Sequence, residues 1–188
     1  MKYSHDHDCP FEAYITNLGK YNEGYLIGEW VKFPATEDTL NAVFKRIGIG
    51  SEDAFGCPYE EWFITDYDCY VEGIYGVLGE YENLDTLNDL AEKLEDMDDE
   101  TYEKFLAVCS DRCLMSLSDI LEVIEDLDKY NILSDIKNAK DYGYYLIENG
   151  EYDLSSCPEI RNFIDYEKLG TENSMDGTFT DYGYIEEI

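Results

Sequence analysis

Residues 12–48 read EAYITNLGKYNEGYLIGEWVKFPATEDTLNAVFKRIG, and this stretch sets the fold class of the chain. Alternating β-branched and aromatic residues predict two strands, around Ala13–Asn17 and Tyr25–Phe33. The sequence GKYNEG between them is rich in turn-forming residues, so we predict that it joins the strands in a hairpin.

A helix is predicted directly after the hairpin. Thr36 can cap its first turn and Gly48 can end it. The residues between them carry an apolar stripe at i, i+3, i+4 and i+7, made by Leu40, Val43, Phe44 and Ile47. A further strand, buried on both faces, is predicted over Glu61–Asp66. Together these elements predict a small α+β unit.

From Leu84 to Leu127, β-branched and aromatic residues become scarcer and helical periodicity replaces alternation. We predict three helices here, the third behind a Ser118 cap. Their apolar stripes are Leu84, Leu87, Ala91 and Leu94; Phe105, Leu106 and Cys109; and Leu121, Ile124 and Leu127. Beyond Asn131 the pattern predicts a helix marked by Ile136, Ala139, Gly143, Leu146 and Ile147 and ending at Gly150, a helix from Pro158 to Gly170, and a final strand over Phe179–Ile185.

The charge of the chain is its most unusual property. Forty-four acidic residues stand against 13 basic ones, and the net charge is −31. The acids are interleaved with apolar residues, which predicts a folded body covered in carboxylates rather than a disordered tail. Duplex DNA carries one charge per roughly 1.7 Å, so this charge equals that of roughly 53 Å of duplex. Nucleic acid is therefore disfavoured as a direct ligand, and basic partners are favoured.

Several other classes of function are disfavoured by the sequence. The N-terminus lacks the features of a signal peptide and no apolar run is long enough to span a membrane, so we expect a cytoplasmic protein without membrane contact. The six cysteines show no paired spacing and are interpreted as reduced thiols. The cluster His5–Cys9 has metal-ligand residue types but no second ligand group, so no metal or other cofactor is expected. No motif indicates catalysis, which leaves an acidic hydrolase as a distant alternative.

The acidic residues of the helical segment are ordered. Asp85, Asp89, Glu92, Asp96 and Asp99 follow at spacings of 4, 3, 4 and 3, which would place all five on one face of a continuous helix. A second group lies on the later helix. The predicted partner-binding carboxylates are Glu60, Glu61, Asp66, Asp68, Asp85, Asp89, Glu92, Asp96, Asp99, Glu122, Glu125 and Asp126.

Two plainer interpretations compete with a binding role for these stripes. Each could be the solvated face of an amphipathic helix, although such faces normally mix charges of both signs. Adaptation to high salt also enriches Asp and Glu, but it predicts no spatial order.

Four segments carry a family resemblance. Tyr14–Phe33, Glu60–Asp68, Asn162–Gly170 and Gly177-Thr178-Phe179 resemble the ArdA family of antirestriction proteins. The resemblance implies an elongated, curved homodimer that mimics bent duplex DNA and is carried by mobile elements. It also implies binding to the DNA groove of Type I restriction–modification enzymes, formed by their specificity and methyltransferase subunits.

The same resemblance implies three modules in a row. They are an α+β module at residues 1–72, a helical module at 73–112 and a second α+β module at 113–188, and the changes in composition near 73 and 113 agree with these bounds. The leading hypothesis is thus a non-enzymatic DNA mimic with an α+β fold. The alternative is an acidic adaptor that binds a basic nucleoid or polymerase-associated protein without imitating a duplex.

Overall fold

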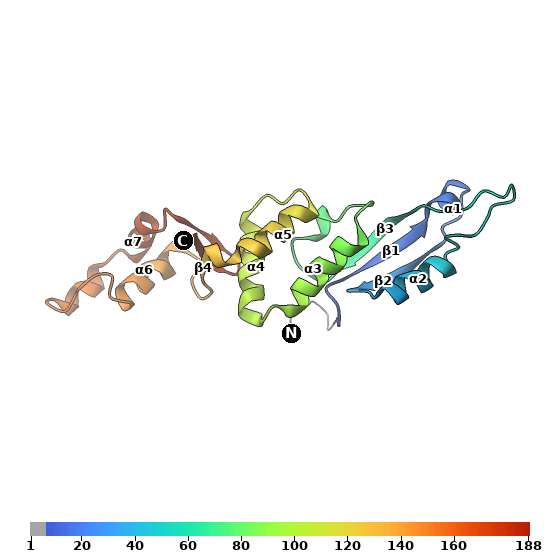
Figure 1. Cartoon of the computed structure of the whole chain (residues 1–188). Helices are drawn as coiled ribbons and strands as arrows, with labels where there is room; N and C mark the ends of the chain where they lie inside the picture. Colours follow the sequence, from blue (N-terminus) through green and yellow to red (C-terminus); the bar gives the residue numbers. More distant parts are fainter. Residues whose placement is uncertain (1–6) are drawn as a thin grey trace. The chain divides into compact units, whose positions relative to one another are not determined.

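The computed structural model describes residues 7–188, which form an α+β fold with two three-stranded sheets (Figure 1). This confirms the predicted fold class. The chain divides into two compact units. Of the described residues, unit 1 contains 7–98 and 114–121, and unit 2 contains 99–113 and 122–188. The three modules remain a prediction.

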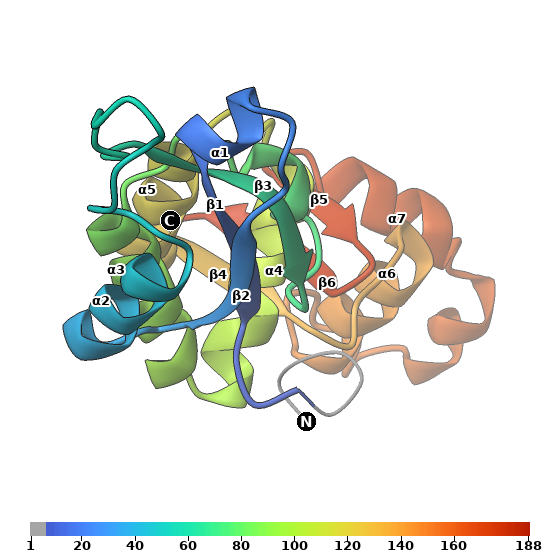
Figure 2. The same ribbon diagram turned by 90° about the vertical axis from the view of Figure 1, so that its right-hand side faces the viewer.

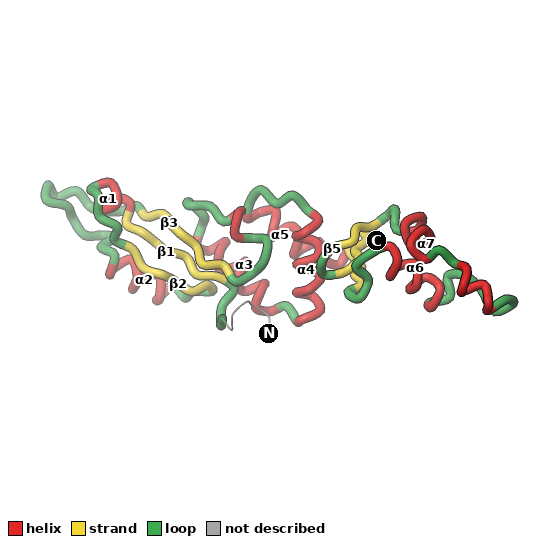
Figure 3. The backbone as a smooth tube through the Cα atoms, turned by 180° about the vertical axis from the view of Figure 1, so that it is seen from behind, coloured by secondary structure: helices red, strands yellow, loops and turns green. Residues whose placement is uncertain are grey.

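Unit 1 is built on an antiparallel sheet of β1 (Phe11–Asn17), β2 (Gly28–Phe33) and β3 (Trp62–Cys69), in the order β2-β1-β3 (Figure 3). The β1–β2 pair confirms the predicted hairpin. Its connection differs from the predicted turn, because it begins with the short helix α1 (Leu18–Asn22). The Asn17 side chain caps this helix by accepting a hydrogen bond of 2.9 Å from the backbone N–H of Lys20.

A β-bulge interrupts the pairing of β3 with β1. Tyr14 pairs with Asp66 and Ile15 pairs with Ile64, so Thr65 is an extra residue without a partner in the ladder. The Thr65 hydroxyl instead lies 2.8 Å from that of Thr16. The strand also runs three residues beyond the predicted end, because the bulge restores the alternation of buried and exposed residues after Asp66.

Helix α2 (Glu37–Arg46) follows β2 as predicted. The Thr36 hydroxyl accepts a hydrogen bond of 3.2 Å from the N–H of Thr39, and Gly48 takes the positive φ of 85° that ends the helix. Helices α2 and α3 (Leu84–Asp96) lie on the same side of the sheet (Figure 2). The core of unit 1 includes fully buried side chains from the strands and from α3, namely Phe11, Ile15, Phe33, Ile64, Leu87, Leu90 and Leu94.

The helices predicted between Leu84 and Leu127 are present as α3, α4 (Asp99–Asp111) and α5 (Leu117–Asp126). The Ser118 cap is wrong, because the Ser116 hydroxyl accepts the N–H of Asp119 at 3.3 Å. The predicted α5 stripe is also wrong in part: Leu127 is buried, but the other buried side chains are Leu117, Ile120 and Val123 rather than Leu121 and Ile124. This helix has apolar residues on more than one stripe, so packing decides which of them is buried.

Unit 2 contains a second antiparallel sheet, with β6 (Gly183–Glu187) between β4 (Tyr130–Leu133) and β5 (Gly177–Thr180). Helix α6 (Ala139–Glu148) ends before Gly150 as predicted and packs on α7 (Tyr166–Asn173). The short 3-10 segments of the chain are Tyr75–Val77, Leu127–Lys129 and Pro158–Phe163. A small core joins this sheet to α6 through Tyr142, Leu146 and Tyr184.

Three predictions in unit 2 need correction. The helix predicted from Pro158 to Gly170 is instead a 3-10 segment followed by α7, and Gly170 lies inside α7. The single strand predicted over Phe179–Ile185 is two strands, because Gly183 turns the chain at a φ of 147°. Strand β4 was not predicted, since four residues are too few for a clear alternation.

Candidate functional site

The twelve predicted carboxylates all lie in the described part of the chain and are accessible to solvent. Ten are exposed, and the remaining two, Asp89 and Asp126, are half-buried. These two form ion pairs within the chain, Asp89 with Lys93 and Asp126 with Lys129 at 2.6 Å. Ion pairs that remain this accessible to water contribute little to stability, but each one offsets the negative charge of its carboxylate.

Helix α3 carries the best-ordered group. Its inner face is buried through Leu84, Leu87, Leu90, Ala91 and Leu94, and Asp85, Asp89, Glu92 and Asp96 follow the outer face. At a rise of about 1.5 Å per residue, these four carboxylates are spaced by about 4–6 Å along the axis. The buried stripe fixes the rotation of the helix, so the carboxylates form one row.

The beginning of α3 is fixed by a cap. The Asn83 side chain accepts hydrogen bonds from the N–H groups of Asp85 at 2.7 Å and Thr86 at 3.3 Å. Asp85 therefore lies in the first turn, where the helix dipole stabilises a negative charge. The cap thus fixes the backbone position from which the first carboxylate of the row projects.

The predicted continuation of this row to Asp99 is wrong. Helix α3 ends at Asp96, Met97 adopts an extended conformation with ψ 138°, and α4 begins at Asp99. The spacing of 4, 3, 4, 3 persists across the break, but Asp99 belongs to the first turn of another helix. The row therefore consists of four carboxylates, all of them on α3.

The carboxylates of β3 lie on the opposite side of the unit 1 sheet. Asp66 pairs with Tyr14 and Asp68 pairs with Glu12, both on the face away from α2 and α3. Asp68 accepts a hydrogen bond of 3.1 Å from the Tyr70 hydroxyl, and Asp66 accepts one of 2.9 Å from the N–H of Tyr67. The structure therefore does not bring the α3 and β3 carboxylates onto one face.

The remaining predicted residues occupy other elements. Glu60 and Glu61 precede β3, and the Glu61 carbonyl accepts the N–H of Leu18 at 3.0 Å. Glu122 and Glu125 are exposed on α5. In unit 2, the hydrogen bond from Arg112 to the Tyr130 hydroxyl raises the pKa of the guanidinium, and nearby carboxylates, including Glu122, raise it further.

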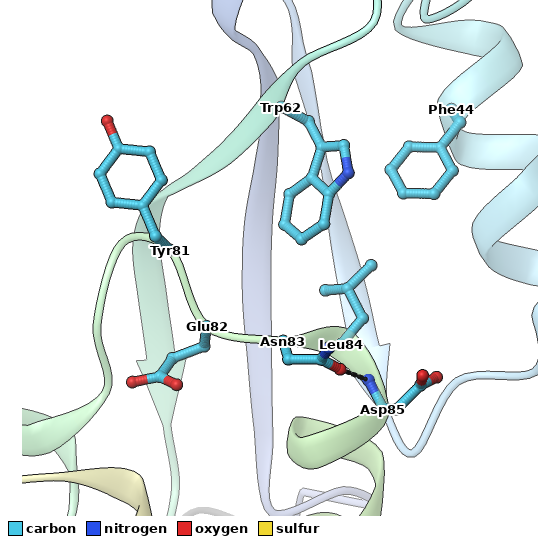
Figure 4. A pocket seen from close by; sticks show the side chains of 7 residues that line it. All are labelled: Phe44, Trp62, Tyr81, Glu82, Asn83, Leu84 and Asp85. Carbon is cyan, nitrogen blue, oxygen red and sulfur yellow. Dashed lines mark hydrogen bonds between the residues drawn. The ribbon is translucent and has the colours of Figure 1, made fainter.

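A pocket of about 430 Å³ lies at the start of α3 (Figure 4). The Trp62 and Phe44 rings, whose centroids are 5.7 Å apart, form its apolar part. Glu82 and Asp85 supply its carboxylates, and the Asn83 cap lies between them. Its lining has no histidine, cysteine or basic residue and can offer apolar surface and negative charge.

Sequence reasoning missed a second hollow, on the open face of the sheet. We call it the aromatic groove, and it is lined by Tyr14, Tyr21, Leu26, Trp30, Phe63, Thr65, Asp66 and Glu80. Alternation within a predicted strand shows which residues of that strand share a face with Tyr14 or with Trp30, but it does not show that the two strands are neighbours. Only the pairing of the strands places these two rings side by side.

In the described residues, no group of three His, Cys, Asp or Glu side chains is arranged to hold a metal ion. Of the cluster weighed above, His5 and Asp6 lie outside the described residues. Burial raises the pKa of the Cys9 thiol to about 11 and that of Cys109 to about 12, so both are neutral thiols at pH 7. Cys9, Cys57, Cys69, Cys109 and Cys157 are free thiols. No helix in residues 7–188 is long and apolar enough to cross a membrane.

Comparison with known proteins adds the family. A search among curated proteins found no match to this chain. The family model described as antirestriction protein (ArdA) matches residues 13–186 of the 188-residue chain. The chain therefore belongs to the ArdA family of antirestriction proteins.

Proposed function

We propose that this protein inhibits Type I restriction–modification enzymes by mimicking bent duplex DNA. Its carboxylates would take the place of phosphates in the DNA groove formed by the specificity and methyltransferase subunits. This inhibition is stoichiometric binding and needs neither catalysis nor a cofactor. If a mobile genetic element encodes this inhibitor, the inhibitor would protect the DNA of that element from restriction when it enters a new host cell.

The observation that carries the proposal is the row of carboxylates on α3. Asp85, Asp89, Glu92 and Asp96 lie on a helix whose inner face is buried, so the helix sets their spacing of about 4–6 Å along its axis. One strand of duplex DNA presents a phosphate every roughly 3.4 Å of axis. The two spacings agree within a factor of two.

The placement of the other carboxylates also suits a mimic. Asp66 and Asp68 lie on the face of the sheet opposite α3, so unit 1 carries negative charge on two sides. A duplex likewise carries phosphates around its circumference, and a groove that surrounds DNA contacts it from several directions. A carboxylate cluster on a single face would suit a flat basic surface better.

The direct test is charge reversal on α3. The triple variant D89K/E92K/D96K changes the net charge from −31 to −25, because each reversal adds two charges. We expect it to lose inhibition of a purified Type I enzyme by at least tenfold while circular dichroism shows an unchanged helix content. The control E148K/E151K/D176K makes the same change in net charge at three exposed residues of unit 2 outside the predicted set, and should retain inhibition.

Two outcomes of this test would overturn the proposal. Equal losses in the two triple variants would show that only total charge matters. Full inhibition by D89K/E92K/D96K would show that α3 makes no contact.

DNA competition separates the mimic from an acidic adaptor. A mimic excludes labelled duplex from the enzyme in proportion to its own occupancy. An adaptor for a nucleoid or polymerase-associated protein would leave the restriction–modification enzyme active and bound to DNA.

The proposal includes a homodimer. Two copies would double the length of duplex that can be imitated. Sedimentation equilibrium at micromolar concentration tests this part separately, and a mass of 21.8 kDa at all concentrations would refute it.

A further inference from the structure

The open face of the unit 1 sheet carries the aromatic groove, a hollow of about 450 Å³. Strand pairing places Trp30, Tyr14 and Asp66 in one row across β2, β1 and β3. The Tyr14 and Trp30 rings meet edge to face with centroids 5.3 Å apart. The Tyr21 and Phe63 rings make a second edge-to-face pair at 5.1 Å.

Phe63 is buried at the floor of the groove, but three of the side chains that line it are exposed. Trp30 is 43% exposed, Tyr21 49% and Leu26 61%. Scattered apolar side chains on a surface are ordinary, but a contiguous aromatic hollow marks an interaction site. The groove is therefore a surface that a partner would cover.

The backbone is adapted to form this hollow. Gly28 pairs with Thr16 on the same face, and a Cβ on Gly28 would lie 2.6 Å from Cε1 of Tyr14. Because Cε1 belongs to the rigid aromatic ring, the whole Tyr14 ring would have to move to make room for this Cβ. Glycine at position 28 leaves the space into which the Tyr14 ring leans.

The charge of the groove selects its ligand. Asp66 and Glu80 line it, and none of its lining residues is basic. Lys32, two residues from Trp30 on the same face of β2, forms an ion pair with Asp8 at 2.7 Å. An anion would be repelled, and a purely apolar ligand would leave the carboxylates unused. A planar cation suits both the aromatic rings and the carboxylates of the groove, because it stacks on the rings and donates hydrogen bonds to the carboxylates.

Arginine fits this chemistry better than lysine. Its guanidinium is flat, weakly hydrated and able to bind a carboxylate through two parallel hydrogen bonds, whereas the ammonium of lysine is a compact, strongly hydrated charge. We propose that the aromatic groove binds an arginine side chain of a basic protein partner, with the guanidinium stacked on the Trp30 ring, beside Tyr14, and hydrogen-bonded to Asp66. The identity of that partner rests on the proposed function, while the arginine preference rests on the groove alone.

Tryptophan fluorescence gives a direct test. The chain has two tryptophans, so in a W62F variant Trp30 is the only one. Tetra-arginine amide and tetra-lysine amide carry the same charge and are titrated at one fixed ionic strength. We expect the arginine peptide to change Trp30 emission and to bind about two- to fivefold more tightly, the factor that a partly exposed cation–π contact provides. Equal affinities, or an unchanged emission, would overturn the inference.

Paired variants locate the preference. D66N/E80Q removes two carboxylates from the groove, and E151Q/D176N removes two exposed carboxylates elsewhere. By calorimetry, the first should abolish the preference for arginine and the second should retain it. G28A, which displaces Tyr14 without changing charge, should also abolish it. If both charge variants weaken binding equally, the arginine peptide binds diffusely and the inference fails.

These results are distinguishable from a failure of the proposed function. If the peptides bind equally well while D89K/E92K/D96K still loses inhibition, the groove inference is wrong and the mimic stands. If the protein inhibits no Type I enzyme but retains the arginine preference in the groove, the mimic is wrong and the groove stands.

Discussion

Gly170 of α7 lies against the backbone of Gly143 of α6. A Cβ on Gly170 would lie 2.9 Å from the backbone nitrogen of Gly143 and 1.6 Å from the carbonyl oxygen of Ala139. In the other direction, a Cβ on Gly143 would lie 2.0 Å from the carbonyl oxygen of Tyr166. The two helices pack closely because each contributes a glycine where they meet.

G170A should destabilise the protein by about 1–3 kcal/mol or more, because the helices must separate to admit the methyl group. Helix propensity alone would predict the opposite sign, since alanine is favoured over glycine by about 1 kcal/mol inside a helix. Urea unfolding measures the difference. G76A is the control, because a Cβ there meets no atom within 4 Å. A G170A protein as stable as the wild type would contradict this packing.

The cap of α5 gives a second comparison. Ser116 accepts the N–H of Asp119, and the exposed Ser118 was the cap predicted from sequence. We expect S116A to cost about 1 kcal/mol, as is usual for an N-cap, and S118A to have a smaller effect. Thermal unfolding of the two variants measures both. A larger loss for S118A would place the helix start two residues later.

The pH dependence of stability should report on Asp119. Hydrogen bonds from the N–H groups of Met115, at 2.8 Å, and Ser116, at 2.9 Å, hold the pKa of this carboxyl below its usual value. A lowered pKa stabilises the fold above the unfolded-state pKa, and this stabilisation is lost as pH falls through the folded-state pKa. The gap in Tm between wild type and D119N should therefore be present at pH 7 and shrink below about pH 4. A gap that grows with acidity would contradict these bonds.

Salt should affect folding and binding in opposite directions. Self-repulsion at a net charge of −31 destabilises the folded protein, and raising NaCl from 0.1 to 1 M shortens the Debye length from about 10 Å to about 3 Å. Tm should rise over this range. The affinity for the restriction–modification enzyme should fall steeply, as for protein–DNA complexes, because counterions released on binding gain less entropy when they enter a more concentrated salt solution. A flat logarithmic dependence of affinity on salt would contradict occupation of a DNA groove.

Local sequence signals predicted the elements whose ends are marked by side chains. Helix α2 has a Thr36 cap, one apolar stripe and a terminal Gly48, and the structure agrees at each point. The break between α3 and α4 carries no such mark. Met97 and Asp98 are neither glycine nor proline, so the row of acids appeared to continue to Asp99.

The aromatic groove could not be predicted for a different reason. Tyr14, Trp30 and Phe63 belong to three strands, and their proximity depends on which strands pair and in which register. Alternation assigns each residue to a face of its own strand only. The order β2-β1-β3 and the extra residue Thr65 are properties of the assembled sheet.

The bulge at Thr65 has a consequence for any attempt to transplant β3 into another scaffold. In an uninterrupted ladder, Ile64, Asp66 and Asp68 would share one face, because side chains alternate along a strand. A host sheet would then have to bury two aspartates or leave an isoleucine in water. The graft would succeed only if the host sheet accommodated the same β-bulge. The sequence of β3 and its bulge must therefore be transplanted together.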